Sequence, residues 1–290
     1  MIDQDQIVPG IALIAGAVFG IYKYIHRPVK DIVVSAPAVL RTDLMYGYYG
    51  RLRNQVAETI DHVNLLWESQ FEGELNMITN ILAAKLPTVL DVGTQCFQKI
   101  EASGLNHHYK EDAEDLLRGL FTRLKANGAL QYVKWLYPLD EPNTNTTVVD
   151  LVYAIRSCKK VALEFPELAD VKFAVIYAAK PETYDCIALF DLVGVDDYDN
   201  KSQIFTNGTY ARLKAQLRSN QKTIILPGGA FGQDITSFIN TAHSNPEVSV
   251  VLPFVWFGPM VPADKWIGIG DDKNPLKAQY VQAGKLLTGK

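Results

Sequence analysis

The pattern of hydrophobic and polar positions divides the chain into two kinds of segment that alternate. Short aliphatic and aromatic runs recur about every 25 to 40 residues, and stretches of helical period separate them. The apolar runs cover residues 44–49, 63–67, 88–92, 132–137, 173–177, 192–196, 223–226 and 248–256. The helical stretches cover residues 51–60, 73–85, 110–127, 148–165, 207–219 and 233–244. Nearly continuous apolar strands followed by helices indicate a parallel sheet covered on its faces.

Eight such strands predict the α/β fold class and a (β/α)8 barrel over residues 43–290. The alternative, a doubly wound sheet, should carry a glycine-rich phosphate loop after its first strand. Residues 46–51 instead read Tyr-Gly-Tyr-Tyr-Gly-Arg, and neither GxGxxG nor GxxxxGK[ST] occurs in the chain. The sequence therefore favours the barrel and gives no sign of nucleotide binding or of a second domain.

The N-terminus carries an uncharged apolar stretch over residues 6–22, followed by an aromatic and basic collar. About 17 residues is the lower limit for a helix that crosses a bilayer. The stretch predicts a membrane anchor helix with its collar over residues 1–30, then a linker over residues 31–42. A cleaved signal peptide fits poorly, because Asp3 and Asp5 precede the stretch where positive charge is expected. The remaining alternative is a helix that docks through residues 7–22 into a virion or another assembly.

Composition narrows the function classes. Apolar residues make up 48% of the chain, charged residues 21%, and the net charge is −4, so nothing favours a nucleic-acid partner. Three scattered cysteines do not suggest a disulfide framework, and the five histidines do not fall together at strand ends. We therefore expect no metal and no cofactor. A serine or cysteine nucleophile lacks a GxSxG elbow.

The candidate chemistry centres on two adjacent acids, Asp140 and Glu141, which follow the apolar run at residues 134–139. Paired acids at the end of a buried strand suggest acid/base chemistry in a working loop. The alternative is ordinary helix capping, for which an acidic residue before a helix is common.

In a barrel the C-terminal ends of the strands converge on one mouth, so residues at those ends are expected to meet there. The candidate substrate-binding residues are Tyr46, Tyr48, Trp67, Glu68, Asp91, Tyr137, Tyr177, Tyr198 and Trp256. The candidate catalytic residues are Asp140, Glu141 and Asp196. Further residues at these ends are Tyr49, Gln95, Asp197, Gly228, Gly229 and Phe231, and Trp266 follows in a later loop. Aromatic faces stack on sugar rings, and glycoside hydrolysis needs two carboxyl groups, so a carbohydrate ligand is expected.

Two segments carry a resemblance to a known family. The sequence Tyr-Pro-Leu-Asp-Glu-Pro at residues 137–142 and the sequence Asp-Leu-Val-Gly-Val-Asp-Asp-Tyr at residues 191–198 resemble strands four and six of barrel glycoside hydrolases. The resemblance implies that Glu141 is the general acid/base, with Asp140 tuning its pKa or binding substrate. The chain departs from the family pattern at residues 226–229, Leu-Pro-Gly-Gly, where retaining members carry a glutamate nucleophile on strand seven.

The second carboxylate therefore has to come from elsewhere. Asp196 is the first choice because it ends a strand across part of the mouth, and Glu68 and Asp91 are the alternatives. Asp196 could instead only hold the loop that follows it. The sequence thus predicts an O-glycoside hydrolase. The alternative is a non-catalytic carbohydrate-binding or virion or envelope protein on the same barrel, favoured by the missing glutamate and by the apolar N-terminus.

Overall fold

The computed structural model describes residues 41–50, 56–69, 73–100, 106–179, 185–198, 203–206, 208–257 and 267–290. The predicted anchor helix at residues 7–22, its collar, most of the linker and Trp266 lie outside these residues. In the part of the chain that the structure describes, no helix is long and apolar enough to span a bilayer. Attachment to a membrane or an assembly and the domain boundaries remain predictions.

The described chain forms an eight-stranded parallel sheet, which confirms the barrel predicted from the eight apolar runs. Its strands are β1 (Met45–Tyr46), β2 (Leu66–Glu68), β3 (Thr88–Asp91), β6 (Val133–Tyr137), β7 (Lys172–Ala178), β8 (Leu192–Asp196), β9 (Lys222–Ile225) and β10 (Val248–Val251). The strand order is β1-β10-β9-β8-β7-β6-β3-β2, with every adjacent pair parallel. Neighbouring strands thus follow one another in sequence around the barrel, with β1 and β2 at the two ends of the order.

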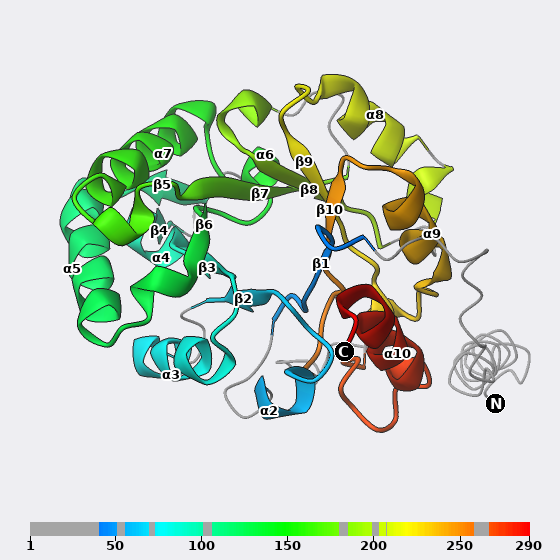
Figure 1. Cartoon of the computed structure of the whole chain (residues 1–290). Helices are drawn as coiled ribbons and strands as arrows, with labels where there is room; N and C mark the ends of the chain where they lie inside the picture. The colour runs from blue at the N-terminus through cyan, green and yellow to red at the C-terminus, as the bar shows by residue number, and fades with distance from the viewer. Residues whose placement is uncertain are drawn as a thin grey trace, which may run out of the picture.

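Helices surround the strands (Figure 1). The helices are α2 (Val56–Thr59), α3 (Glu74–Ala84), α4 (Gly93–Cys96), α5 (Ala113–Ala126), α6 (Pro142–Asn145), α7 (Val148–Ala162), α8 (Thr209–Gln216), α9 (Thr236–Ser244) and α10 (Lys277–Thr288). Short 3-10 turns are η3 (Leu130–Tyr132), η4 (Pro166–Leu168), η5 (Ile187–Leu189), η6 (Gln203–Phe205) and η7 (Gly229–Phe231). The periodicity did not predict α10, nor the antiparallel hairpin of β4 (Phe97–Lys99) and β5 (His107–Tyr109).

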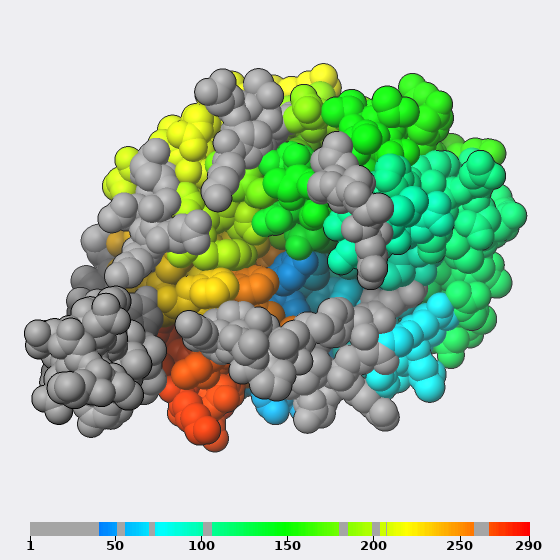
Figure 2. Space-filling model, turned by 180° about the vertical axis from the view of Figure 1, so that it is seen from behind, coloured from blue at the N-terminus to red at the C-terminus, as the bar shows by residue number. Residues whose placement is uncertain are grey.

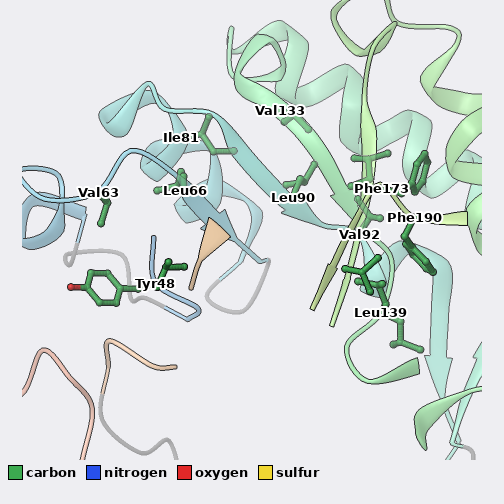
Figure 3. Packing of buried hydrophobic residues seen from close by; sticks show 14 of the residues in the cluster. Tyr48, Val63, Leu66, Ile81, Leu90, Val92, Val133, Leu139, Phe173 and Phe190 are labelled. Atoms are coloured by element: carbon green, nitrogen blue, oxygen red, sulfur yellow. The ribbon is translucent and has the colours of Figure 1, made fainter. Parts of the chain in front are cut away.

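Side chains along each strand divide between two apolar cores, because successive residues point to opposite faces. The inner core fills the barrel and consists of Leu65, Trp67, Val89, Tyr137, Ala174, Ile176, Leu192, Ile224, Leu226, Val250 and Leu252. The outer core lies between the strands and the helices. Figure 3 shows part of it, where Leu66 and Leu90 from neighbouring strands pack with Ile81 of α3. A residue can reach the mouth from a strand end only if it lies on the inner face.

The seam between β1 and β2 is closed by hydrogen bonds outside the ladder. The backbone carbonyl of Tyr46 accepts hydrogen bonds from the backbone N–H groups of Asn64, at 3.0 Å, and of Leu65, at 3.1 Å. The side-chain amide of Asn64 adds two more, accepting from Tyr46 N at 2.7 Å and donating to the carbonyl of Leu44 at 3.1 Å. Gly47 permits the close approach, because a Cβ there would lie 2.7 Å from the carbonyl oxygen of Leu65. The barrel therefore closes through two backbone hydrogen bonds and two hydrogen bonds of the Asn64 side chain.

We expect Asn64→Ala to lower the free energy of unfolding by about 2 kcal/mol, because it removes two side-chain hydrogen bonds worth about 1 kcal/mol each. Urea unfolding monitored by circular dichroism measures the change. The control is Asn127→Ala, which removes one exposed amide contact at the end of α5 and should change stability by less than about 0.5 kcal/mol. Equal effects of the two substitutions would contradict the role given to Asn64.

Candidate active site

The mouth lies at the C-terminal ends of the barrel strands and is lined by residues of their inner face. Trp67, Asp91, Tyr137 and Asp196 come from the ends of β2, β3, β6 and β8, and Tyr49 continues the inner face of β1. Figure 2 shows one face of the molecule hollowed at its centre, with blue, green, yellow and orange segments around the hollow. Strands far apart in sequence thus contribute to a single recess.

The turn after β6 presents the two adjacent acids. Glu141 adopts a left-handed backbone conformation, with φ 43° and ψ 54°, and its N–H donates to the carbonyl of Ile176 at 3.0 Å. The side chain of Asn143 clamps the turn onto β7, accepting from Ala178 N at 3.0 Å and donating to Ala178 O at 3.2 Å. A non-glycine residue in this conformation costs free energy, so the surrounding contacts must hold it.

Helix capping does not account for the two acids. No backbone N–H of helix α6 donates a capping hydrogen bond to the side chain of Glu141, which accepts a 3.5 Å hydrogen bond from the hydroxyl of Thr144, and the longer α7 is capped by Thr147. Neither carboxylate is therefore used in the way that the capping interpretation requires.

Asp140 is held by two tyrosines. The hydroxyl of Tyr137 donates to Asp140 Oδ1, and the hydroxyl of Tyr49 also hydrogen-bonds the carboxyl group. Asp140 touches solvent at the open end of the barrel while protein surrounds it on its other sides. Burial raises its pKa to about 6, the charge of Glu141 adds to the rise, and the two tyrosine hydroxyls oppose it.

Asp196 and Glu141 form a hydrogen-bonded pair across the mouth. Burial, followed by the neighbouring charge and hydrogen bond of Glu141, raises the pKa of Asp196 to about 9. Two carboxyl groups in contact cannot both ionise easily, so Asp196 keeps its proton at neutral pH. The mouth therefore holds an un-ionised acid beside a second carboxyl group.

Asp91 is the fourth carboxyl group of the mouth. Its Oδ1 accepts a hydrogen bond of 2.8 Å from the backbone N–H of Gly93, which favours the ionised form. Burial outweighs this bond and raises the pKa of Asp91 to about 6, with a smaller contribution from Asp140. Among the causes of the shifts at Asp91, Asp140 and Asp196, none is a lysine or an arginine.

Aromatic rings line the other side of the recess in a continuous series. The ring of Tyr49 lies 5.6 Å from that of Trp67 and 5.7 Å from that of Phe254. Tyr198 continues the series, with its ring 5.0 Å from Phe254 and 5.1 Å from Phe231. Except for the buried Trp67, these rings keep part of their surface exposed. We call these five residues the aromatic wall, which suits the apolar face of a sugar ring.

The turn after β9 has no room for a side chain. A Cβ at Gly228 would lie 2.8 Å from the ring of Tyr198, and one at Gly229 would lie 2.7 Å from Ile269 and Tyr280. The family resemblance expects a glutamate near this turn. The close packing explains why glycines occupy it here.

Five of the predicted substrate-binding residues do not reach the mouth, and the prediction is corrected for them. Tyr46, Tyr48, Tyr177 and Trp256 belong to the outer core, and Glu68 is buried on the same outer face. Their polar atoms have structural partners: Tyr46 donates to Tyr280 O, Glu68 accepts from Asn80, Tyr177 donates to Asp185 O and Trp256 donates to Glu58. The alternation of side chains excludes Tyr46, Tyr48, Glu68 and Tyr177, since each lies one position away from an inner-face residue. It does not account for Trp256, which lies two positions after Phe254.

Two contributors were not singled out from the sequence as site residues. Phe254 lies inside the last apolar run and belongs to the inner face, and Asn143 follows the acidic pair. The alternation along the run could have indicated Phe254, whereas no local signal indicates the clamp by Asn143. In the described residues, no group of three or more histidine, cysteine, aspartate or glutamate side chains is arranged to hold a metal ion.

Comparison with known proteins finds solved structures with a similar fold. No family model and no curated protein sequence matches the chain. Among solved structures, a GH2 β-galacturonidase from Eisenbergiella tayi bound to galacturonate matches with a TM-score of 0.58 and 13% identity, over 87% of this chain and 51% of that chain. The fold is that of the glycoside hydrolase barrels.

Two further matches have lengths closer to that of this chain. A family 17 β-1,3-glucanosyltransferase from Rhizomucor miehei matches with a TM-score of 0.51 and 13% identity, over 78% of this chain and 92% of that chain. A GH113 β-1,4-mannanase matches with a TM-score of 0.50 and 11% identity, over 83% and 96%. The chain spans about half the length of the β-galacturonidase. At these identities the likeness establishes the fold and leaves the activity to the site itself.

We expect Asn143→Ala to lower the free energy of unfolding by about 2 kcal/mol, because it breaks both hydrogen bonds to Ala178 and leaves Glu141 in an unfavourable conformation. Glu141→Gly should recover part of the loss when added to Asn143→Ala, since glycine adopts positive φ without strain. Urea denaturation of the single and double variants measures both effects. An Asn143→Ala variant as stable as the parent chain would show that the clamp does not hold the turn.

The raised pKa of Asp196 also predicts a pH dependence of stability. The folded state holds its proton at pH values where the unfolded chain has lost it, so stability falls as pH rises from about 4 towards 9. Asp196→Asn removes this dependence, and we expect it to stabilise the fold at pH 9 by on the order of 2 kcal/mol after solvent screening. The gain should shrink towards pH 4. Asp170→Asn, at an exposed aspartate before β7, serves as the control, and thermal unfolding across pH measures the difference.

Proposed function

We propose that this chain is a glycoside hydrolase that binds a glycan at the barrel mouth and uses Glu141 and Asp196 together to move the catalytic proton. The observation that carries the proposal is that the turn after β6 and the end of β8 bring Glu141 and Asp196 together in the mouth, where burial and the neighbouring Glu141 raise the pKa of Asp196. Glycoside hydrolysis requires an un-ionised acid at the leaving oxygen. The aromatic wall beside the pair supports a sugar ligand.

The proton path follows from the hydrogen bond. Glu141 donates a proton to the glycosidic oxygen as the bond from that oxygen to the anomeric carbon breaks, and Asp196 replenishes Glu141 through their shared bond. The electrons of the broken bond go to the leaving oxygen. A water molecule then adds to the anomeric carbon and returns its proton to the pair. General acid catalysis of this kind contributes about 10² to 10⁴ in rate.

Asp140 is the best candidate for the second carboxyl function. A pair of carboxyl groups in hydrogen-bond contact lies closer together than the roughly 5 Å or more that separates the two catalytic groups of glycosidases. Glu141 and Asp196 therefore act as one acid/base unit, and another group must face the developing positive charge of the sugar. The hydrogen bonds from Tyr49 and Tyr137 to Asp140, and its position at the open end of the barrel, support that role.

A second candidate function follows from the turn after β9. Gly228 and Gly229 leave no space for the carboxylate that retaining barrel glycosidases carry there, which favours a protein that binds a glycan without cleaving it. Such a protein would keep the aromatic wall and use the carboxyl groups only to accept hydrogen bonds from sugar hydroxyls. Turnover by the parent chain separates the two candidates.

Glu141→Gln should lower hydrolysis by at least about 10³-fold while leaving the fold and glycan binding intact, because the amide keeps the shape and loses the acid. Asp196→Asn should lower it by about 10- to 100-fold and move the alkaline limb of the pH–rate profile to lower pH, since the proton reservoir is lost. The assay is release of reducing ends from a panel of oligosaccharides.

Glu111→Gln, at an exposed glutamate before α5, is the matched control and should leave turnover unchanged. Wild-type turnover that survives in Glu141→Gln would contradict the proposed mechanism. A parent chain that binds members of the panel and cleaves none would establish the second candidate instead.

A further inference from the structure

The charges of the mouth determine which sugars it can accept. Asp91, Asp140, Glu141 and Asp196 converge on the recess from β3, the turn after β6 and β8. The shifts in the pKa values of Asp91, Asp140 and Asp196 arise from burial, from hydrogen bonds and from neighbouring carboxyl groups, and no lysine or arginine is among the causes. In the described part of the chain this recess is therefore acidic without a balancing cation.

Described basic side chains near the strands are engaged elsewhere. The ammonium group of Lys110, which follows the β4–β5 hairpin, donates a hydrogen bond of 2.7 Å to the carbonyl of Thr94. Arg118 and Arg123 of α5 pair with Glu164 and Glu74 on the outside of the barrel. In these contacts none of the three side chains bonds a carboxyl group of the mouth.

This arrangement disfavours the binding of an acidic sugar. The carboxylate of a uronic acid would add a further negative charge to a recess where two carboxyl groups already share a proton because both cannot ionise. A neutral sugar offers hydroxyl donors instead, which match the acceptors at Asp140 and Asp91, and its C–H face can stack on Tyr49 and Tyr198. The acidic groups thus favour an uncharged sugar, and the aromatic wall suits its C–H face.

We propose that the mouth selects glycans built from uncharged sugars and binds them at least tenfold more tightly than the matching uronates. The inference rests on the proposed function, because it requires that the mouth bind a glycan. The selectivity comes from the carboxyl groups that the described strand ends bring to the recess, of which Asp140 is the most exposed to a ligand at the open end of the barrel.

The test compares matched pairs of oligosaccharides that differ only at C6, namely gluco against glucurono, galacto against galacturono and manno against mannurono chains. Binding is measured by calorimetry at pH 7 with the full chain carrying Glu141→Gln, so that hydrolysis does not interfere. In the pair that binds, the neutral member should have a dissociation constant at least tenfold lower. Adding Asp140→Asn or Asp91→Asn should reduce that ratio about threefold, whereas Asp170→Asn should leave it unchanged.

Each outcome decides a different point. A uronate that binds as tightly as its neutral partner would overturn the inference and leave the proposed glycan site standing. Failure of all pairs to bind would overturn the proposed function and the inference with it. A ratio that both aspartate substitutions leave unchanged, with folding confirmed by circular dichroism, would show that these carboxyl groups do not cause the selectivity.

Discussion

The alternation of side chains along strands that are buried on both faces controls the rest of this molecule. Each barrel strand must supply apolar residues to an inner core and to an outer core, so half of its positions are unavailable to the mouth whatever their chemistry. Trp67 and Glu68 are neighbours in sequence, yet one faces the inside of the barrel and the other contacts Asn80 of α3. The mouth is assembled from inner-face positions of several strands because only those positions lead to the same recess.

The same constraint explains the electrostatic character of the site. Inner-face carboxyl groups at neighbouring strand ends have little space to separate, and burial removes the water that would screen them. Asp196 stays protonated for this reason, and the carboxyl group of Asp140 is stabilised by hydrogen bonds from two tyrosine hydroxyls. Together with the left-handed backbone of Glu141, this crowding works against stability. Contacts outside the mouth, such as the clamp by Asn143, must offset it.

The sequence predicted the parts of the structure that repeat and missed those that depend on contacts between distant segments. Eight apolar runs sufficed for the barrel, since each run had to become a buried strand. The acidic pair at residues 140–141 was placed at the mouth because it ends a run. Tyr46, Tyr48 and Trp256 were assigned to the mouth because they lie near strand ends, and the face of the strand on which each side chain lies was not considered. Assigning each run a register would have excluded Tyr46 and Tyr48 but not Trp256, which lies two positions after the inner-face residue Phe254. The contact of Glu141 with Asp196 depends on the distance between two strands.

The turn after β9 connects these observations to the reaction. Retaining barrel glycosidases need two carboxyl groups on opposite sides of the scissile bond. Here Tyr198 leaves no space for a side chain at Gly228, while Glu141 and Asp196 are already in contact. Under the proposed function the pair acts as a single proton carrier, and the second carboxylate is Asp140, from the same turn that supplies Glu141, rather than a residue of the turn after β9. Asp140 meets that requirement only because the left-handed conformation at Glu141 lets adjacent residues serve separate parts of the recess.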